Sequence, residues 1–245
     1  MDLNTTLNLR EKIDYWHKFC VFFLIVTILL CLGQIVFSTF FQNSENFVNY
    51  FILRKGNISV VNIFFSNFVN KDLWEFYINL FIMWLGLVLF FIFFKKRTKR
   101  FFPTYIFIFF LISPLIISLI NVELLQISTL NNMLGFSGIA TVFLGFGVYS
   151  LSEFFYHTKL GNIDTSFKKY LKKIFTLVIP IIFLVIMFCL PGVIYNIINY
   201  GIFQGIILTI DRTKVNLIAH VIGFSFGFLT PVILNPVMGI FVSGE

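Results

Sequence analysis

The segment MLGFSGIATVFLGFGVYSLS, residues 133–152, has the length and apolar character of a membrane span. The first of its serines lies between glycines. About 20 apolar residues are needed for a helix to cross a bilayer. Near the start of this span, Gly135-Phe136-Ser137-Gly138 places a hydroxyl beside residues that allow another helix to approach closely. Because a membrane serine alone usually serves helix packing, the function of Ser137 depends on its neighbours.

A second polar residue occurs in a later apolar stretch, Ala219-His220-Val221-Ile222-Gly223. A histidine at membrane depth is a functional candidate by default, because ionisable groups are costly there. Gly223 and Gly227 follow His220 on the same helical side, so this segment is expected to pack closely on the span of residues 133–152. We therefore predict that the His220 imidazole reaches Ser137 and acts as its general base.

Composition places the whole chain in lipid. The 245 residues are 58% hydrophobic and 12% charged, with a mean hydropathy of +0.93. A net charge of +7 would suggest nucleic acid for a soluble protein, but here the basic residues flank apolar spans, where they set topology. We expect the bilayer as a partner and no nucleic acid. No nucleotide, metal or haem motif is present, so no cofactor is expected.

Six spans are predicted, which makes the fold class an all-α polytopic membrane protein with a six-helix bundle. The organisation is a cytoplasmic segment (1–18), a membrane domain (19–235) and a short cytoplasmic tail (236–245). The spans are Phe19–Phe40, Leu73–Phe94, Phe102–Ile120, Met133–Ser152, Ile174–Ile197 and Val215–Ile233.

The distribution of lysine and arginine predicts the orientation. With the N-terminus inside, thirteen of the eighteen basic residues lie in inner segments, so both termini are expected in the cytoplasm of a protein of the cell membrane. Spans four and six then enter from outside. Ser137 is predicted about one turn deep and His220 about a turn and a half deep, at similar levels.

The long outer loop, residues 42–72, contains apolar stretches too short to span, Phe47–Leu53 and Val60–Phe65. We expect them to form short helices in the membrane interface. Polar residues near the outer face are expected to line a cavity that admits water; they are Asn70, Asp72, Glu75, Asn79, Asn131 and Asn132.

Three motifs together resemble the rhomboid intramembrane serine proteases. Residues 68–79, running on to Trp84-Leu85-Gly86, resemble the start of that family's second span. The Gly-x-Ser-Gly at 135–138 and the Ala-His-x-x-Gly at 219–223, with Gly227, resemble its fourth and sixth spans. The likeness extends over nearly the whole chain from about residue 15.

The resemblance implies a serine endopeptidase that cleaves transmembrane segments of other membrane proteins. Ser137 would be the nucleophile and His220 the general base, without an acidic third member. Asn79 falls where the family has an oxyanion-binding asparagine, and Gly135 and Glu75 would belong to the same substrate-binding region. Gly138, Gly223 and Gly227 are the expected helix-packing residues. The oligomeric state is not predicted.

The sequence departs from the family pattern at Glu75, where a histidine is usual, and also at Asn70 and Thr141. An ionised Glu75 would oppose an oxyanion, whereas a protonated one would donate to it; alternatively, Glu75 faces water and leaves Asn79 alone. A catalytically weak or inactive rhomboid-like protein that binds membrane clients is therefore the alternative function. A transporter is less consistent with the sequence, because acidic residues lie at span ends.

Overall fold

The computed structural model describes residues 9–41, 51–54, 56, 58–70, 73–93, 101–127, 132–133, 135–159 and 219–235. The described part of the chain is mostly helical, and four of its helices are long and apolar enough to cross a membrane. They are His17–Phe40 within α1 (Leu9–Phe41), Leu73–Phe93 (α4), Phe102–Glu123 and Ser137–Phe154 within α8 (Ser137–Lys159). A shorter apolar helix, Ala219–Asn235, is called the C-terminal helix below.

These positions agree with four of the predicted spans. The C-terminal helix overlaps the sixth predicted span, Val215–Ile233, and ends slightly beyond it. The predicted fifth span, Ile174–Ile197, lies outside the described residues. Several boundaries differ from the predicted ones, and the difference that concerns the site is at the fourth span, where the helix begins at Ser137 instead of Met133. Met133 pairs in a short strand, and Gly135 has a positive φ of 155°, so the backbone before Ser137 is not helical.

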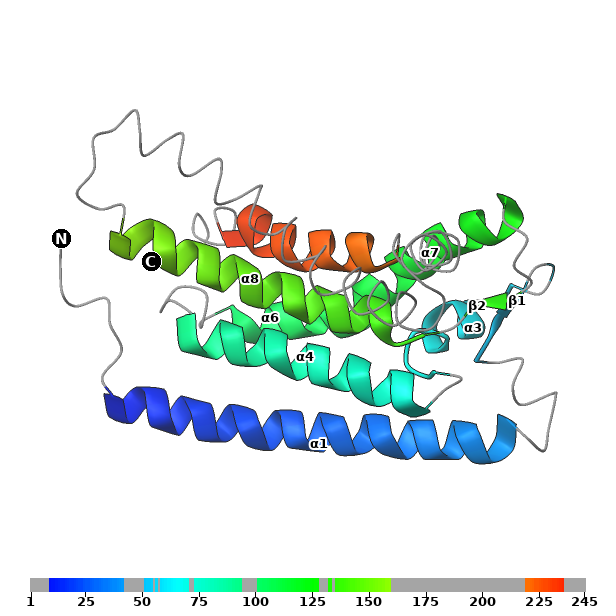
Figure 1. Ribbon diagram of the computed structural model, residues 1–245, viewed down its shortest axis with the longest axis horizontal. Coiled ribbons are helices and arrows are strands. Elements are labelled where there is room, and N and C mark those ends of the chain that lie inside the picture. The colour runs from blue at the N-terminus through cyan, green and yellow to red at the C-terminus, as the bar shows by residue number, and fades with distance from the viewer. Residues whose placement is uncertain are drawn as a thin grey trace, which may run out of the picture.

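Helix α8 lies at the centre of the molecule. Of its membrane span 78% is buried, compared with 17% of the span in α1, which lies at the edge of the structure (Figure 1). A helix that is apolar all round is stable only when other elements or lipid cover every face. The two values indicate that protein covers α8, whereas the apolar residues of α1 mostly remain available to lipid.

Glycines let two neighbouring helices approach the α8 backbone. On one side a Cβ at Gly86 of α4 would overlap the Phe143 carbonyl, and a Cβ at Gly147 would overlap the Gly86 carbonyl. On the other side a Cβ at Gly145 would overlap the carbonyl of Phe224 in the C-terminal helix. In lipid, such small-residue contacts are a main source of helix association, because burial of apolar surface gives little gain there.

The third span is not a continuous α-helix. It comprises α6 (Phe102–Phe107), the π-helical segment η2 (Ile108–Ile112) and α7 (Ser113–Ile127). Pro114, the second residue of α7, has no N–H to donate. The regular hydrogen bond to the carbonyl four residues earlier therefore cannot form at this point. The backbone widens into a π-helical segment, and Ser113 Oγ donates to the Phe109 carbonyl at 2.5 Å.

One end of the molecule carries the loop structures and the starts of α4, α8 and the C-terminal helix (Figure 1). We call it the loop end. Strands β1 (Leu53–Arg54) and β2 (Asn132–Met133) pair antiparallel there. The predicted short helix Val60–Phe65 is α3, capped by Ser59, whose Oγ accepts from the Asn62 N–H at 3.2 Å. The other apolar stretch, Phe47–Leu53, was also expected to be helical, but its last residue, Leu53, lies in strand β1.

The Asn67 side chain links the end of α3 to the third span through hydrogen bonds. Its Nδ2 donates to the Pro114 carbonyl at 3.2 Å and to Ser118 Oγ at 2.6 Å. The carbonyl of Ile63, in α3, accepts from the same nitrogen at 3.0 Å. A buried amide with several acceptors gives a fixed arrangement, since breaking it would leave polar groups unsatisfied. The loop that precedes α4 is thereby held at the loop end.

Candidate functional site

Ser137 is the first residue of α8 and is 8% exposed. Two features fix the turn before it. Gly135 adopts a positive φ that other residues rarely reach, and its N–H donates to the Ser66 carbonyl at 2.9 Å. Ser137 therefore lies at a helix N-terminus, where free backbone N–H groups carry partial positive charge. The sequence predicted a position about one turn inside the span, so this electrostatic feature was not foreseen.

His220 lies at the start of the described part of the C-terminal helix and is half-buried. This helix runs parallel to α8: a Cβ at Gly223 would overlap the Gly138 carbonyl, and a Cβ at Gly227 would overlap the Val142 carbonyl. His220 is three residues before Gly223, so it lies near the level of the Gly135–Ser137 turn. No hydrogen bond between Ser137 and His220 is among those that the described residues form.

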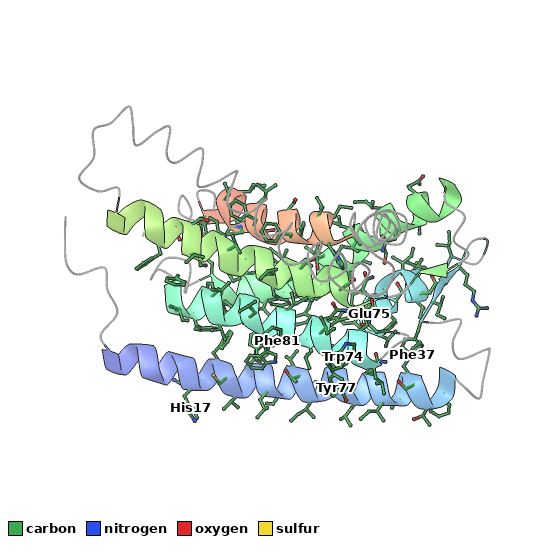
Figure 2. All side chains as sticks on the ribbon, in the orientation of Figure 1. His17, Phe37, Trp74, Glu75, Tyr77 and Phe81 are labelled. Atoms are coloured by element: carbon green, nitrogen blue, oxygen red, sulfur yellow. The ribbon has the colours of Figure 1, made fainter. Side chains whose placement is uncertain are left out.

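Helix α4 contributes Asn79 and Glu75, which are one turn apart. Asn79 is 5% exposed, and its Nδ2 has no hydrogen-bond partner among the described residues. The rings of Phe76 and Phe136 lie 5.9 Å apart, so the first turn of α4 is beside the residue before Ser137. Glu75 is exposed, as are Trp74 and Tyr77 near the start of the same helix (Figure 2).

Asn70 connects the loop to the start of α8. It is fully buried, and its Oδ1 accepts from the Phe136 N–H at 3.1 Å. Its own backbone is held from α1: the Asn70 N–H donates to Gln34 Oε1 at 2.8 Å, and Gln34 Nε2 donates to the Asn70 carbonyl at 2.7 Å. The sequence predicted Asn70 as a lining residue of a wet cavity and marked it as a departure from the rhomboid pattern. It gave no sign of the Gln34 contact, because the two residues are 36 positions apart.

Replacing Gln34 with leucine is expected to lower the free energy of unfolding by about 1–3 kcal/mol, because the buried N–H and carbonyl of Asn70 both lose their partner. Thermal unfolding in detergent micelles measures this. Thr39→Ala is the matched control, since the Thr39 hydroxyl donates to the Ile35 carbonyl of its own helix. Equal unfolding midpoints for the Gln34→Leu variant and the wild type would contradict the structural role of Gln34.

The side chains gathered at the loop end are of the kinds used in acyl transfer. A hydroxyl, an imidazole and buried amide donors are the groups required for a nucleophile, a base and an oxyanion site. Among the described ranges, no three His, Cys, Asp or Glu side chains are grouped as metal ligands. Comparisons of the chain with protein-family models, with curated proteins and with solved structures found no match.

Proposed function

We propose that the chain is a rhomboid-like intramembrane serine endopeptidase with a six-span bundle. Ser137 is the nucleophile, His220 is the general base, and the substrates are transmembrane segments of other membrane proteins. The positive-inside distribution supports a protein of the cell membrane with both termini in the cytoplasm. The loop end, with the start of α8, then faces the exterior.

One observation carries the proposal: α8 and the C-terminal helix pack in parallel through Gly138 and Gly223. Each glycine lies within one turn of a chemically active residue, Ser137 on one helix and His220 on the other. Parallel packing keeps the two at a common level, whereas antiparallel packing would separate them along the axis. A helix pair with this register supports a serine–histidine dyad more than it supports simple packing.

The mechanism follows from these positions. The His220 imidazole accepts the Ser137 hydroxyl proton while Oγ bonds to the scissile carbonyl carbon, and the carbonyl electron pair moves to oxygen. The C–N bond then breaks, and the imidazolium returns its proton to the leaving nitrogen. Water, deprotonated by the same imidazole, hydrolyses the acyl ester and restores Ser137. A longer separation of the two groups in the free enzyme is compatible with this, because catalytic hydrogen bonds often tighten when substrate binds.

Two elements support oxyanion stabilisation. Helix N-termini leave backbone N–H groups without intrahelical partners, and the N–H of Ser137, the first residue of α8, is the proposed donor to the oxyanion. Asn79 Nδ2 is a buried amide donor that is not already engaged by another described residue. Preorganised donors of this kind are worth about 10²–10³ in rate each. Gly135 places no side chain beside Ser137 Oγ, where a Cβ would lie 3.5 Å from that oxygen.

The alternative is a client-binding protein with weak or no activity. It is favoured by Glu75, since this exposed carboxylate stands where the family has a histidine. A carboxylate at this position would oppose the oxyanion when it is ionised, whereas a histidine would donate to it. The two functions differ in a single property, which is whether Ser137 is nucleophilic.

A fluorophosphonate probe tests this property without knowledge of the substrate. We expect stoichiometric labelling of wild-type protein in detergent micelles, with the adduct on the peptide that contains Ser137. Ser137→Ala should remove the label, because the proposed nucleophile is then absent. Ser150→Ala is the matched control, since Ser150 is buried on the same helix and donates to the Phe146 carbonyl. Absence of label from folded wild-type protein would favour the client-binding alternative.

A further inference from the structure

Asn70 carries a hydrogen-bond donor that the fold does not use. The side chain is fully buried, and Nδ2 has no hydrogen-bond partner among the described residues. Buried polar groups in native structures are nearly always satisfied, and a persistent exception commonly serves a ligand or catalysis. The donor is therefore a candidate for contact with a molecule that enters the site.

The orientation of this donor is fixed by its surroundings. The Phe136 N–H needs an acceptor, so it selects Oδ1 of the amide and directs Nδ2 the other way. The backbone of Asn70 cannot shift freely either, because the Gln34 side chain bonds both its N–H and its carbonyl. A donor held in this manner is preorganised, and needs little rearrangement when an acceptor arrives.

The donor and the Ser137 hydroxyl border the same space. A carbon added at Gly135 in the position of a Cβ would lie 3.6 Å from Asn70 Nδ2 and 3.5 Å from Ser137 Oγ. Glycine leaves that position empty, and its positive φ disfavours any other residue there. Asn70 Nδ2 and Ser137 Oγ therefore lie on the same side of the Gly135 backbone, where a substrate carbonyl that reaches Ser137 would also approach the amide donor.

We propose that Asn70 Nδ2 donates a hydrogen bond to the scissile peptide carbonyl of the substrate as its oxygen becomes negative. The inference rests on the proposed function and adds a catalytic residue to it. It also accounts for Glu75: a donor from the loop replaces the one that a histidine on α4 would supply. Asn70 and Asn79 then approach the oxyanion from the loop and from α4, on either side of the turn before Ser137.

The rate constant for fluorophosphonate labelling tests the inference, because the phosphonyl oxygen occupies the oxyanion position and the rate constant does not depend on how much protein is folded. We expect Asn70→Ala and Asn70→Asp to lower it about 10²-fold or more. The aspartate variant retains an acceptor for the Phe136 N–H but replaces the donor with a carboxylate oxygen, and the alanine variant removes the donor without adding charge. With a reporter helix as substrate, kcat should fall by the same factor while KM stays unchanged.

Asn67→Ala is the matched control. Asn67 is a buried asparagine of the same loop whose Nδ2 is already bonded to Pro114 and Ser118. Its loss should lower the unfolding midpoint but leave the labelling rate constant within about threefold of wild type. A wild-type rate in both Asn70 variants, or an equal loss in Asn67→Ala, would overturn the inference and leave the proposed function intact. Folded wild-type protein that is never labelled would overturn both.

Discussion

His220→Ala is expected to lower kcat for cleavage of a reporter transmembrane helix by about 10⁴-fold or more, as is Ser137→Ala. Without the imidazole, the hydroxyl has no acceptor for its proton and remains a poor nucleophile in an apolar setting. The measurement is product formation in proteoliposomes that contain purified enzyme and reporter. Expression and the unfolding midpoint should stay near wild type, because neither substitution removes a backbone contact of the helix pair.

The double variant tests whether the two residues act together. Residues that act as one catalytic unit are strongly non-additive, so Ser137→Ala with His220→Ala should cleave no more slowly than either single variant. If the two losses instead multiplied, the residues would act independently and the dyad would be wrong. Thr230→Ala provides a control in the C-terminal helix, because its hydroxyl donates to the Phe226 carbonyl and lies far from the start of that helix.

Among Gly→Ala substitutions at the described glycines, Gly227→Ala is expected to lower the stability of the fold the most. The added carbon would overlap the Val142 carbonyl, so the C-terminal helix must move away from α8. Overpacking of this kind costs about 1–3 kcal/mol, and a rigid backbone partner places it at the upper end. Cleavage should fall as well, since His220 moves with its helix. Thermal unfolding and reporter cleavage measure the two effects.

Gly33→Ala is the matched control for that change. Gly33 lies in α1, and a carbon added there meets no atom within 4 Å. Alanine has the higher helix propensity, so the substitution should be neutral or slightly stabilising. Equal unfolding midpoints for the Gly227 and Gly33 variants would contradict the close packing of α8 with the C-terminal helix.

The sequence predicted the membrane character and most helix positions because these depend on long apolar runs. Span two was predicted to begin at Leu73, and α4 does begin there. Residues Val60–Phe65 were predicted as a short helix and form α3. Such features are local: each is encoded by the length of an apolar run and by the polar residues that border it.

Features that depend on distant contacts were not predictable. The start of α8 at Ser137 depends on the pairing of Met133 with Leu53 and on the conformation of Gly135. The role of Asn70 depends on Gln34, in another helix. Neither the Met133–Leu53 pairing nor the Asn70–Gln34 contact produces a periodic pattern of residues from which it could be predicted. The roles of Ser137, His220 and Asn79 stay predictions, since their residue types and positions indicate a chemistry that only a functional experiment can establish.

A bifunctional isocoumarin probe tests the central claim most directly. Such a probe acylates a nucleophilic serine and then presents an electrophilic carbon to a nearby imidazole, so it joins two residues only when they lie together. After protease digestion, mass spectrometry should find one cross-linked species that joins the Ser137 peptide to the His220 peptide. Labelled Ser137 joined to a different residue, or folded protein with no serine adduct, would contradict the account.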